Sequence, residues 1–476
     1  MFRVKTAGAW LLLISGSLSA AEPWDDLDAR VNQVLPGVIT LRHAIHQQPE
    51  LSNREFHTRE RIAQRLRELG LEVQTGIAHT GVIGILRGGK PGPVVAIRAE
   101  MDALPLTEQT GLPYASTVRS KDEGGDLRSR GKEVGVMHAC GHDAHMAMAL
   151  GVAEVFAAHR EQLPGTLKLI FQPAEEGPPL GEQGGAQLMI KEGALQNPAP
   201  AVIFGIHVTA GTAGTFTLSR QRTTAAADTF VARIIGRQTH AAFPWTGIDP
   251  VPVAAQVLLA WQTIASRQSN LSLLPAPVIS VGRIEAGDRH NIIPAEVRLE
   301  GSIRTVSDEQ REDVLQRMTR TAEHIAEASG ATAKVDYLPG NYRAGYNNTA
   351  LVDQLMPVLQ QVSTTPVRID NGTYGADDFA EYAREVPGIF MRMGVTPPAL
   401  EGKNVWPTHS PGFQIHDPSL AVGIRALCRM TLSYMRQVDP PLQLPRQQRD
   451  VTGEPTPMLP RTKHWTLSTT KAPAPP

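Results

Sequence analysis

The sequence predicts an α/β protein with a parallel or mixed sheet covered by helices on both faces, interrupted by a small two-layer α+β module. Three observations support this fold class. Short β-branched runs alternate with helical patterns in the first part of the chain. A β-α-β-β-α pattern begins near Thr223, and material resembling the first part resumes after Asn341. The module therefore looks inserted into the larger domain.

The first part begins with a helical pattern over residues 27–69, which carries a charged face and stops at Gly70. Apolar runs at 93–97, 166–171 and 201–206 are expected to be strands, and the Ala-rich stretch 144–159 a helix. Because helices separate these strands, parallel neighbours with helical crossovers are favoured.

The module is expected to place strands at 228–235, 277–285 and 296–304, with helices at 252–266 and 307–329 and a last strand at 333–337. This order is the split βαβ plan. The expected organisation is therefore a leader at 1–21, a large domain formed by 22–222 and 339–438, the module at 223–338 and an extended tail at 439–476.

The N-terminus has the order of a secretory signal. Arg3 and Lys5 precede an apolar run over 7–18, and Ser19 and Ala21 occupy the small-residue positions before a cleavage point after Ala21. The run is shorter than the roughly 20 residues that a membrane span needs, although a buried helix or an uncleaved anchor is the alternative. Export is expected, most simply to the periplasm of a Gram-negative cell, with no membrane span after cleavage.

The overall charge makes nucleic acid an unfavourable partner. The 476 residues include 46 basic and 47 acidic side chains, giving a net charge of −1, and no basic stripe is visible. Of the two cysteines, Cys428 belongs to an apolar stripe at helical spacing and is expected in the core, whereas Cys140 lies among polar residues.

The segment 137–145 is the densest polar cluster in the sequence. It contains Cys140, His142, Asp143 and two further histidines within nine positions, which packing alone does not explain. A cysteine and a histidine at i and i+2 can both face one cation when the backbone is extended, so Cys140 and His142 are candidate metal ligands. Asp143 is placed to cap the helix that follows, and this structural role is its simplest interpretation.

Other polar residues follow the expected strands. Glu175 and Glu176 come directly after the run 166–171, at a strand end where α/β enzymes place their sites. One carboxylate can bind a cation while its neighbour accepts a proton from a metal-bound water. His207 follows the run 201–206 and Asp102 follows the run 93–97, while His409 lies in a Pro-rich loop. Each signal alone is weak, but together they indicate one site.

These residues resemble the aminoacylase/carboxypeptidase family of metallopeptidases, in particular its amidohydrolase branch. That branch includes N-acyl-amino-acid amidohydrolases, hippurate hydrolase and the plant auxin-conjugate hydrolases. The resemblance spans about residues 41–435. It is carried by Arg-Ala-Glu-Met-Asp-Ala-Leu-Pro (98–105), His-Ala-Cys-Gly-His-Asp (138–143), Pro-Ala-Glu-Glu-Gly (173–177), Gly-Ile-His (205–207), Thr-His-Ala-Ala-Phe-Pro (239–244), Asn-Ile-Ile-Pro (291–294), Tyr-Gly-Ala-Asp-Asp-Phe (374–379) and His-Ser-Pro (409–411).

The resemblance implies a zinc-exopeptidase-like catalytic domain with an inserted ferredoxin-like lid and dimerisation domain. It implies one or two divalent ions per subunit, with zinc favoured and manganese, cobalt or nickel possible in a mixed site. Glu175 would be the general base and acid, and Asp102 a supporting carboxylate. Glu100 stands where the dinuclear branches have a histidine, so metal number and identity stay open. The implied ligands are Cys140, His142, Glu176, His207 and His409.

The resemblance also assigns substrate-binding residues to the lid. Asn291 and Arg304 match residues that bind the substrate's carbonyl and carboxylate, and His240 matches a histidine that reaches the partner subunit's site in a homodimer. Two departures flank the expected pocket: a longer, more charged loop at 117–133, and Val-Thr-Ala-Gly after His207 where many members have Trp-Pro.

The expected activity is hydrolysis of an N-acyl or N-aroyl amino acid by a metal-activated hydroxide. Two alternatives remain open. A carboxypeptidase or dipeptidase would use the same residues on a peptide bond, and an exported metal- or ligand-binding protein would use the ligands without the base. The intact Glu175 argues against the second alternative.

Overall fold

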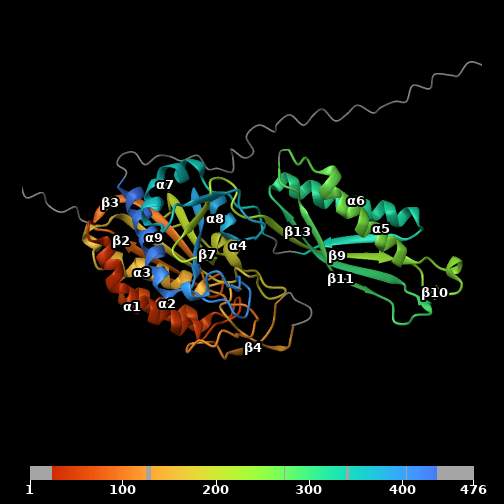
Figure 1. The fold of residues 1–476 in the computed structure, drawn as a ribbon, viewed down its shortest axis with the longest axis horizontal. Coiled ribbons are helices and arrows are strands. Elements are labelled where there is room, and N and C mark those ends of the chain that lie inside the picture. The colour runs from red at the N-terminus through yellow and green to blue at the C-terminus, as the bar shows by residue number, and fades with distance from the viewer. Residues whose placement is uncertain (1–23, 125–129, 273, 339–341, 404, 437–476) are drawn as a thin grey trace, which may run out of the picture.

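The computed structural model describes residues 24–124, 130–272, 274–338, 342–403 and 405–436. The expected leader at 1–21 and the tail at 439–476 lie outside these residues. The chain forms two lobes that lie side by side, a larger one around an eight-stranded sheet and a smaller one around a four-stranded sheet (Figure 1). No helix among the described residues has the length and apolar character needed to cross a bilayer.

The large sheet is mixed, as predicted. Its strands run in the order β1-β2-β6-β3-β7-β16-β8-β15. The neighbours β3 and β6, β3 and β7, β7 and β16, and β8 and β15 are parallel, and the other pairs are antiparallel. The strands are β1 (Glu72–Ile77), β2 (Gly81–Arg87), β3 (Lys90–Glu100), β6 (Pro164–Gln172), β7 (Val202–Thr212), β8 (Phe216–Ser219), β15 (Arg368–Asp370) and β16 (Gly388–Thr396).

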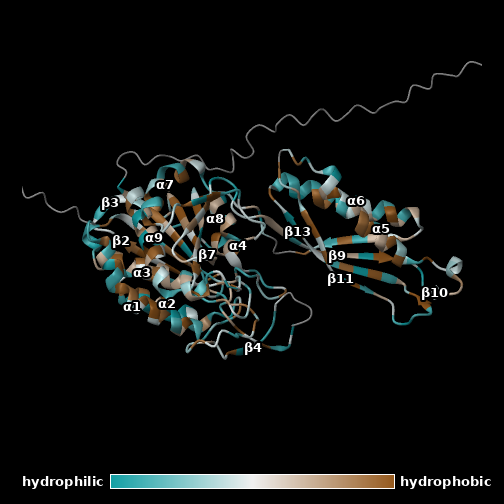
Figure 2. Ribbon diagram, viewed as in Figure 1, coloured by the Kyte–Doolittle hydropathy of each residue, from teal (hydrophilic) through white to brown (hydrophobic). Residues whose placement is uncertain are grey.

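Helices cover both faces of this sheet because its central strands are apolar on both sides. Along β3, Val95, Ile97 and Ala99 pack into one core, whereas Ala96 packs into the other. In Figure 2 these strands are mostly coloured as hydrophobic. The helices α1 (Leu27–His46), α2 (Phe56–Glu68), α3 (His142–Ala157), α7 (Thr349–Val362) and α9 (Leu420–Met435) share the first core, and α4 (Gly185–Lys191) and α8 (Phe379–Glu385) share the second.

The prediction of one helical stretch over 27–69 is wrong in the middle. The chain leaves helical geometry between α1 and α2, where Pro49 and the positive φ of Asn53 (60°) fit an irregular segment. This segment contributes Ser52 and Glu55 to the site described below. Cys428 is fully buried in α9, as expected.

The small lobe lies between β8 and β15 in sequence, which makes it an insertion. Its sheet has the fully antiparallel order β11-β13-β9-β14 with α5 and α6 on one face, the ferredoxin-like arrangement predicted from the sequence (Figure 1). Side chains of Asp249 and Ser307 cap the two helices. The elements are β9 (Ala226–Ile235), α5 (Pro250–Thr263), β11 (Val278–Ala286), β13 (Glu296–Thr305), α6 (Asp308–Ala328) and β14 (Thr332–Tyr337).

Short elements complete the fold. A two-stranded ribbon lies at the end of the small lobe farthest from the large one (Figure 1). The strands β4 and β5 form a second antiparallel two-stranded ribbon. The short elements are β4 (Arg119–Lys121), β5 (Glu133–Gly135), β10 (Thr239–His240), β12 (Ile292–Ile293), η1 (Arg160–Gln162), η2 (Pro244–Thr246), η3 (Ile264–Gln268), η4 (Pro398–Leu400) and η5 (Asp417–Ser419).

Candidate metal centre and active site

The candidate ligands meet at the carboxyl ends of the central strands. Pairing aligns Glu100 at the end of β3 with Gln172 at the end of β6, and Arg98 with Gly205 in β7. One edge of the sheet therefore brings together the segments after β3 and β6, residue His207 of β7 and the start of α3. Open α/β sheets bind ligands at this edge. The loop carrying His409 joins them through its backbone N–H, which donates to the Ala139 carbonyl.

The five candidate ligands form one cluster. Cys140 Sγ lies 3.3 Å from His207 Nε2 and 3.2 Å from His409 Nε2, and His409 Nε2 lies 3.1 Å from Glu176 Oε1. Donor atoms of Cys140, His142 and His207 lie within 4.8 Å of one another, as do those of Cys140, Glu176 and His409. The structure thus brings together all five residues that the sequence singled out.

The orientation of His142 suits metal binding. Its Nδ1 lies 2.8 Å from the Asp102 carbonyl oxygen and donates to it, which leaves Nε2 to face the cluster. Burial opposes protonation of His142, but Asp102 and Glu100 raise its pKa to about 10, so a bound cation would take the place of the proton on Nε2. Nε2 is buried and has no hydrogen-bond partner among the described residues. A carboxylate oxygen of Glu175 is 3.9 Å away. A buried histidine nitrogen without a partner, aimed at a thiol and carboxylates, fits a site that holds a cation.

The donor set of one thiol, three imidazoles and a carboxylate matches a borderline-soft divalent cation. Burial raises the pKa of the Cys140 thiol well above its ordinary value, and the Glu176 and Glu175 carboxylates raise it further. Without a cation the thiol therefore stays protonated. A bound cation reverses this balance, since it stabilises thiolate in the same place.

Gly141 makes the turn between two of these ligands possible. Its φ is +89°, in the left-handed region, and a Cβ added there would lie 2.3 Å from Val208 Cγ2. The close approach to Val208 brings the start of α3 against β7, which carries His207. The geometry of Cys140 and His142 therefore depends on the absence of a side chain at residue 141.

Glu175 is the carboxyl best placed to hold a proton. It is buried, and burial raises its pKa well above the ordinary value, with further increases from the carboxylates of Asp377 and Glu176. A carboxyl with a raised pKa beside a cation site is suited to accept and return a proton near neutral pH. The position agrees with the general acid and base expected from the sequence.

Asp102 supports the site through hydrogen bonds. Its Oδ2 accepts the Ser52 hydroxyl at 2.8 Å and the backbone N–H of Glu176 at 2.9 Å. Its Oδ1 is 3.3 Å from Nδ1 of His142. Burial opposes ionisation, but these bonds lower the pKa of Asp102, so it is a fixed carboxylate.

A buried charge network under the site was not found from the sequence. Arg98 pairs with Glu100, with Asp378 at 2.7 Å and with Asp377 at 3.1 Å. His145 Nδ1 donates to Glu100 at 2.8 Å, while its Nε2 accepts the N–H of Val208. Burial lowers the pKa of His145 to about 4, consistent with a neutral ring. Both ring nitrogens of His145 are thus used in hydrogen bonds that support the site. The neighbouring carboxylates of Asp377 and Asp378 raise the pKa of Glu175.

The expected helix-capping role of Asp143 is wrong. The N-cap residue of α3 has no side-chain capping bond, and Asp143 instead accepts Arg42 Nε and His46 Nδ1, both at 2.9 Å. Arg42 also pairs with Asp417, and His46 with Glu108. Arg42 and His46 come from α1, so these buried ion pairs fasten the ligand-bearing start of α3 to the N-terminal helix. Nothing in the spacing of α1 indicated this contact.

The lid residues are placed differently from one another. Arg304 is a partly buried residue of β13 opposite Ala227, whose backbone pairs with Tyr342. The Tyr342 hydroxyl donates to the Glu175 carbonyl, so Arg304 belongs to the part of the lid nearest the cluster. Among the described residues Arg304 forms no ion pair. His240 is exposed and Asn291 is half-buried at the distal ribbon β10–β12, so the chain itself does not bring them to the cluster (Figure 1).

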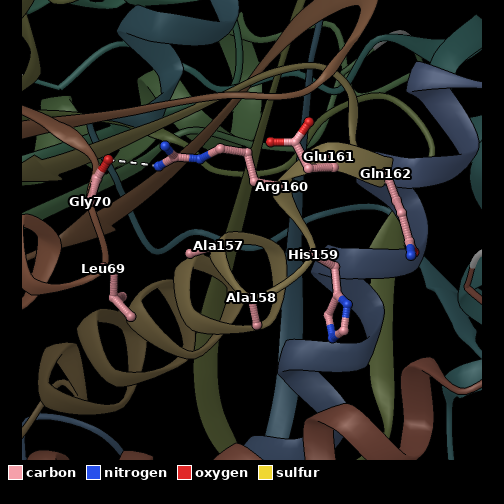
Figure 3. A pocket seen from close by; sticks show the side chains of 8 residues that line it. All are labelled: Leu69, Gly70, Ala157, Ala158, His159, Arg160, Glu161 and Gln162. Atoms are coloured by element: carbon pink, nitrogen blue, oxygen red, sulfur yellow. Dashed lines mark hydrogen bonds between the residues drawn. The ribbon is translucent and has the colours of Figure 1, made fainter.

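A surface hollow of about 430 Å³ lies away from this cluster. It is formed by the ends of α2 and α3 and by η1, and Arg160 there donates to the Gly70 carbonyl at 2.6 Å (Figure 3). His142 begins α3 and the hollow is at its other end, about 24 Å away by helical rise. The hollow contains no candidate ligand.

Three features define a metal-dependent hydrolase. They are the mixed α/β sheet, the buried cluster of sulfur, nitrogen and oxygen donors at its carboxyl edge, and the adjacent carboxyl that can hold a proton. The sequence matches the model of Peptidase family M20/M25/M40 over residues 96–433, and the chain belongs to this family. It is a metal-dependent enzyme that hydrolyses amide bonds.

Relatives and solved structures agree with this family. The N-acetyl-L-cysteine deacetylase of Bacillus subtilis is 36% identical over 80% of this chain and 84% of its own length. Thermostable carboxypeptidase 1 of Saccharolobus solfataricus is 33% identical over 85% and 97%, and the IAA-amino acid hydrolase ILR1-like 2 of Arabidopsis thaliana is 32% identical over 90% and 94%. The crystal structure of the Bacillus subtilis YXEP protein, described as a dinuclear metal binding peptidase, has a TM-score of 0.69 at 30% identity, covering 86% of this chain and 99% of that one.

Proposed function

We propose that the enzyme hydrolyses the amide bond of N-acyl or N-aroyl amino acids, with Glu175 as general base and acid. The observation that carries the proposal is the buried Glu175 carboxyl beside the donor cluster, held where its pKa is raised. Two relatives support the substrate class, because the names of the deacetylase and of the plant hydrolase each describe an amino acid carrying an acyl group.

In this proposal the metal ligands are Cys140, His142, Glu176, His207 and His409. A bound divalent cation would lower the pKa of a water toward about 7 and polarise the amide carbonyl. Glu175 takes a proton at its carboxylate and passes it to the departing amine, for which its raised pKa is suited. Asp102 holds His142 and the Glu176 backbone in place. Zinc suits the thiolate and imidazoles best.

Arg304 is proposed to bind the carboxylate of the amino-acid part of the substrate. Its guanidinium is partly buried, is free of ion pairs among the described residues and lies on the lid strand that pairs with β9 beside Tyr342. A planar guanidinium binds a carboxylate through two parallel hydrogen bonds. His240 and Asn291 are proposed to act on the partner subunit's site in a homodimer, because the distal ribbon holds them away from their own.

A carboxypeptidase or dipeptidase activity is the second candidate, favoured by the thermostable carboxypeptidases among the relatives. The two functions differ only in whether the cleaved amide belongs to an acyl cap or to a peptide bond. Initial rates on N-acetyl and N-benzoyl amino acids, measured beside rates on dipeptides and capped dipeptides, separate them. Turnover of dipeptides alone would replace the first proposal with the second.

The test of the mechanism is Glu175→Gln, with Glu68→Gln in the exposed end of α2 as its matched control. We expect the first variant to keep its metal content, measured by elemental analysis, and to lose hydrolysis by about a hundredfold or more. The control should retain both. Full activity in Glu175→Gln would remove Glu175 from the mechanism.

Export to the periplasm is also proposed, on the signal-like order of residues 1–21. Mass spectrometry of the N-terminus after expression in a Gram-negative host tests this. A mature chain beginning at Glu22 is expected in the periplasmic fraction, and an intact Met1 in the cytosol would refute it.

A further inference from the structure

The turn that carries Glu175 is held by side chains from three distant segments. Glu55 accepts the backbone N–H of Ala174 at 3.0 Å, and Asp102 accepts that of Glu176 at 2.9 Å. The Tyr342 hydroxyl donates to the carbonyl oxygen of Glu175 itself. Ala174 has a φ of 53°, a left-handed conformation that non-glycine residues rarely adopt. Such a residue persists only where its surroundings impose it, and these three bonds do so.

Tyr342 differs from the other two residues because its backbone is hydrogen-bonded to a strand of the lid. Its N–H donates to the Ala227 carbonyl at 3.1 Å, and its carbonyl accepts the Ala227 N–H at 3.0 Å. Ala227 lies in β9, a central strand of the lid sheet, and faces Arg304 across the β9–β13 ladder. Tyr342 is therefore fixed to the lid by its main chain and to the catalytic turn by its side chain.

Other bonds join the lid to the large lobe without reaching this turn. The Tyr346 hydroxyl donates to the Val306 carbonyl at 2.7 Å, and Arg384 forms a two-bond pair with Asp308 at 2.7 and 3.0 Å. The Tyr374 hydroxyl donates to the Ala276 carbonyl. These bonds hold the lid against the large lobe. Among these described tyrosine and arginine hydrogen bonds between the lobes, only the bond from Tyr342 reaches Glu175.

We propose that Tyr342 is a positioning residue, which places Glu175 for proton transfer only when strand β9 of the lid is seated. The proposal rests on the proposed role of Glu175 as general base. Its physical basis is that the turn is strained at Ala174 and that the Glu175 carbonyl takes its bond from a residue tied to the lid. Loss of this bond frees the turn to rotate the Glu175 carboxyl away from the cluster. A displacement of about 1 Å is enough to lower a rate by up to about a hundredfold.

The test compares Tyr342→Phe with Tyr346→Phe. Each variant removes one phenol hydroxyl that donates to a backbone carbonyl and so links the two lobes. The two variants should therefore lose similar amounts of general stability and of lid attachment. We measure kcat, KM, metal content and urea stability for both. The expected result is a fall in kcat of about tenfold to a hundredfold for Tyr342→Phe, with KM and metal content unchanged, and near wild-type kcat for Tyr346→Phe.

Several outcomes would overturn the inference. Equal kcat in the two variants would show that the bond to the Glu175 carbonyl has no separate effect. A rise in KM at constant kcat would make Tyr342 a substrate contact instead. Loss of metal would make it a support of the ligands. The proposed function is judged separately by Glu175→Gln: an active Glu175→Gln refutes the base, whereas an inactive Glu175→Gln with an unaffected Tyr342→Phe refutes only the positioning role.

Discussion

Replacement of Gly141 by alanine tests whether a missing side chain holds the ligand turn together. A non-glycine residue at the observed φ of +89° costs about 1 to 2 kcal/mol. The new Cβ would lie 2.3 Å from Val208 Cγ2, far inside an ordinary contact, and such overpacking costs about 1 to 3 kcal/mol more. The free energy of unfolding should therefore fall by about 2 to 5 kcal/mol. Metal affinity should weaken too, since Cys140 and His142 flank the turn.

Gly111→Ala is the matched control. Gly111 also has a positive φ, +70°, but an added Cβ there meets no atom within 4 Å, so only the backbone strain applies. Urea denaturation of both variants isolates the clash as their difference, about 1 to 3 kcal/mol. Adding Val208→Ala to Gly141→Ala should recover part of this difference, and a double-mutant cycle measures it. Equal losses in the two glycine variants, or no coupling to Val208, would refute the reasoning.

Three further perturbations follow from the buried groups around the site. Arg42→Met removes the guanidinium shared by Asp143 and Asp417 and leaves each carboxylate with only a histidine partner, His46 or His43, so the free energy of unfolding should fall by about 3 kcal/mol; a loss below about 1 kcal/mol would contradict the fastening role of α1. Burial opposes protonation of His46, but Asp143 and Glu108 raise its pKa to about 9, above the ordinary 6.5. The protonated His46 therefore contributes about 3 kcal/mol to stability below pH 6.5, and this contribution is lost as the pH rises through 9. Between these pH values the wild type should lose stability relative to His46→Gln. Parallel curves of unfolding free energy against pH for the two proteins would contradict this role of His46. Chelation removes the metal that covers the Cys140 sulfur, so at the alkaline pH that its raised pKa requires Cys140 should label faster than in the metal-bound protein, while Cys428 stays protected in the core; labelling of Cys140 at equal rates with and without metal would remove it from the ligand set.

Most residues of the candidate site leave a local signal in the sequence, whereas His409, in a Pro-rich loop, was assigned as a ligand only through the family resemblance. Cys140 and His142 lie in a polar run, and Glu175, Glu176 and His207 lie in or directly after apolar strands whose carboxyl ends share an edge. The supporting residues leave no such signal. Arg42 meets Asp143 across 101 residues of sequence, and no periodicity records that pairing.

The missed parts of the fold have a similar explanation. The strands β1 and β2 and the last strand β16 were not identified, and the helical pattern concealed the break before α2. The segment 47–55 supplies Glu55, which is buried and bound to Thr80 and Ala174. Its role depends on where the backbone of the turn at 174 comes to lie, which is a tertiary contact that residue type alone cannot show.

The place of β16 in the large sheet bears on the order in which the chain can fold. β16 lies between β7 and β8, although more than 160 residues, including the whole lid, separate it from either strand in sequence. The lid sheet and its helices are contiguous from Ala226 to Tyr337 and can form as soon as they are synthesised. In the large sheet, by contrast, the edge of β7 that pairs with β16 stays unpaired until the chain from Gly388 onward has been synthesised. A chain that ends before β16 would therefore have a folded lid but an unpaired, apolar strand edge in the large sheet. Such an edge is a template for aggregation.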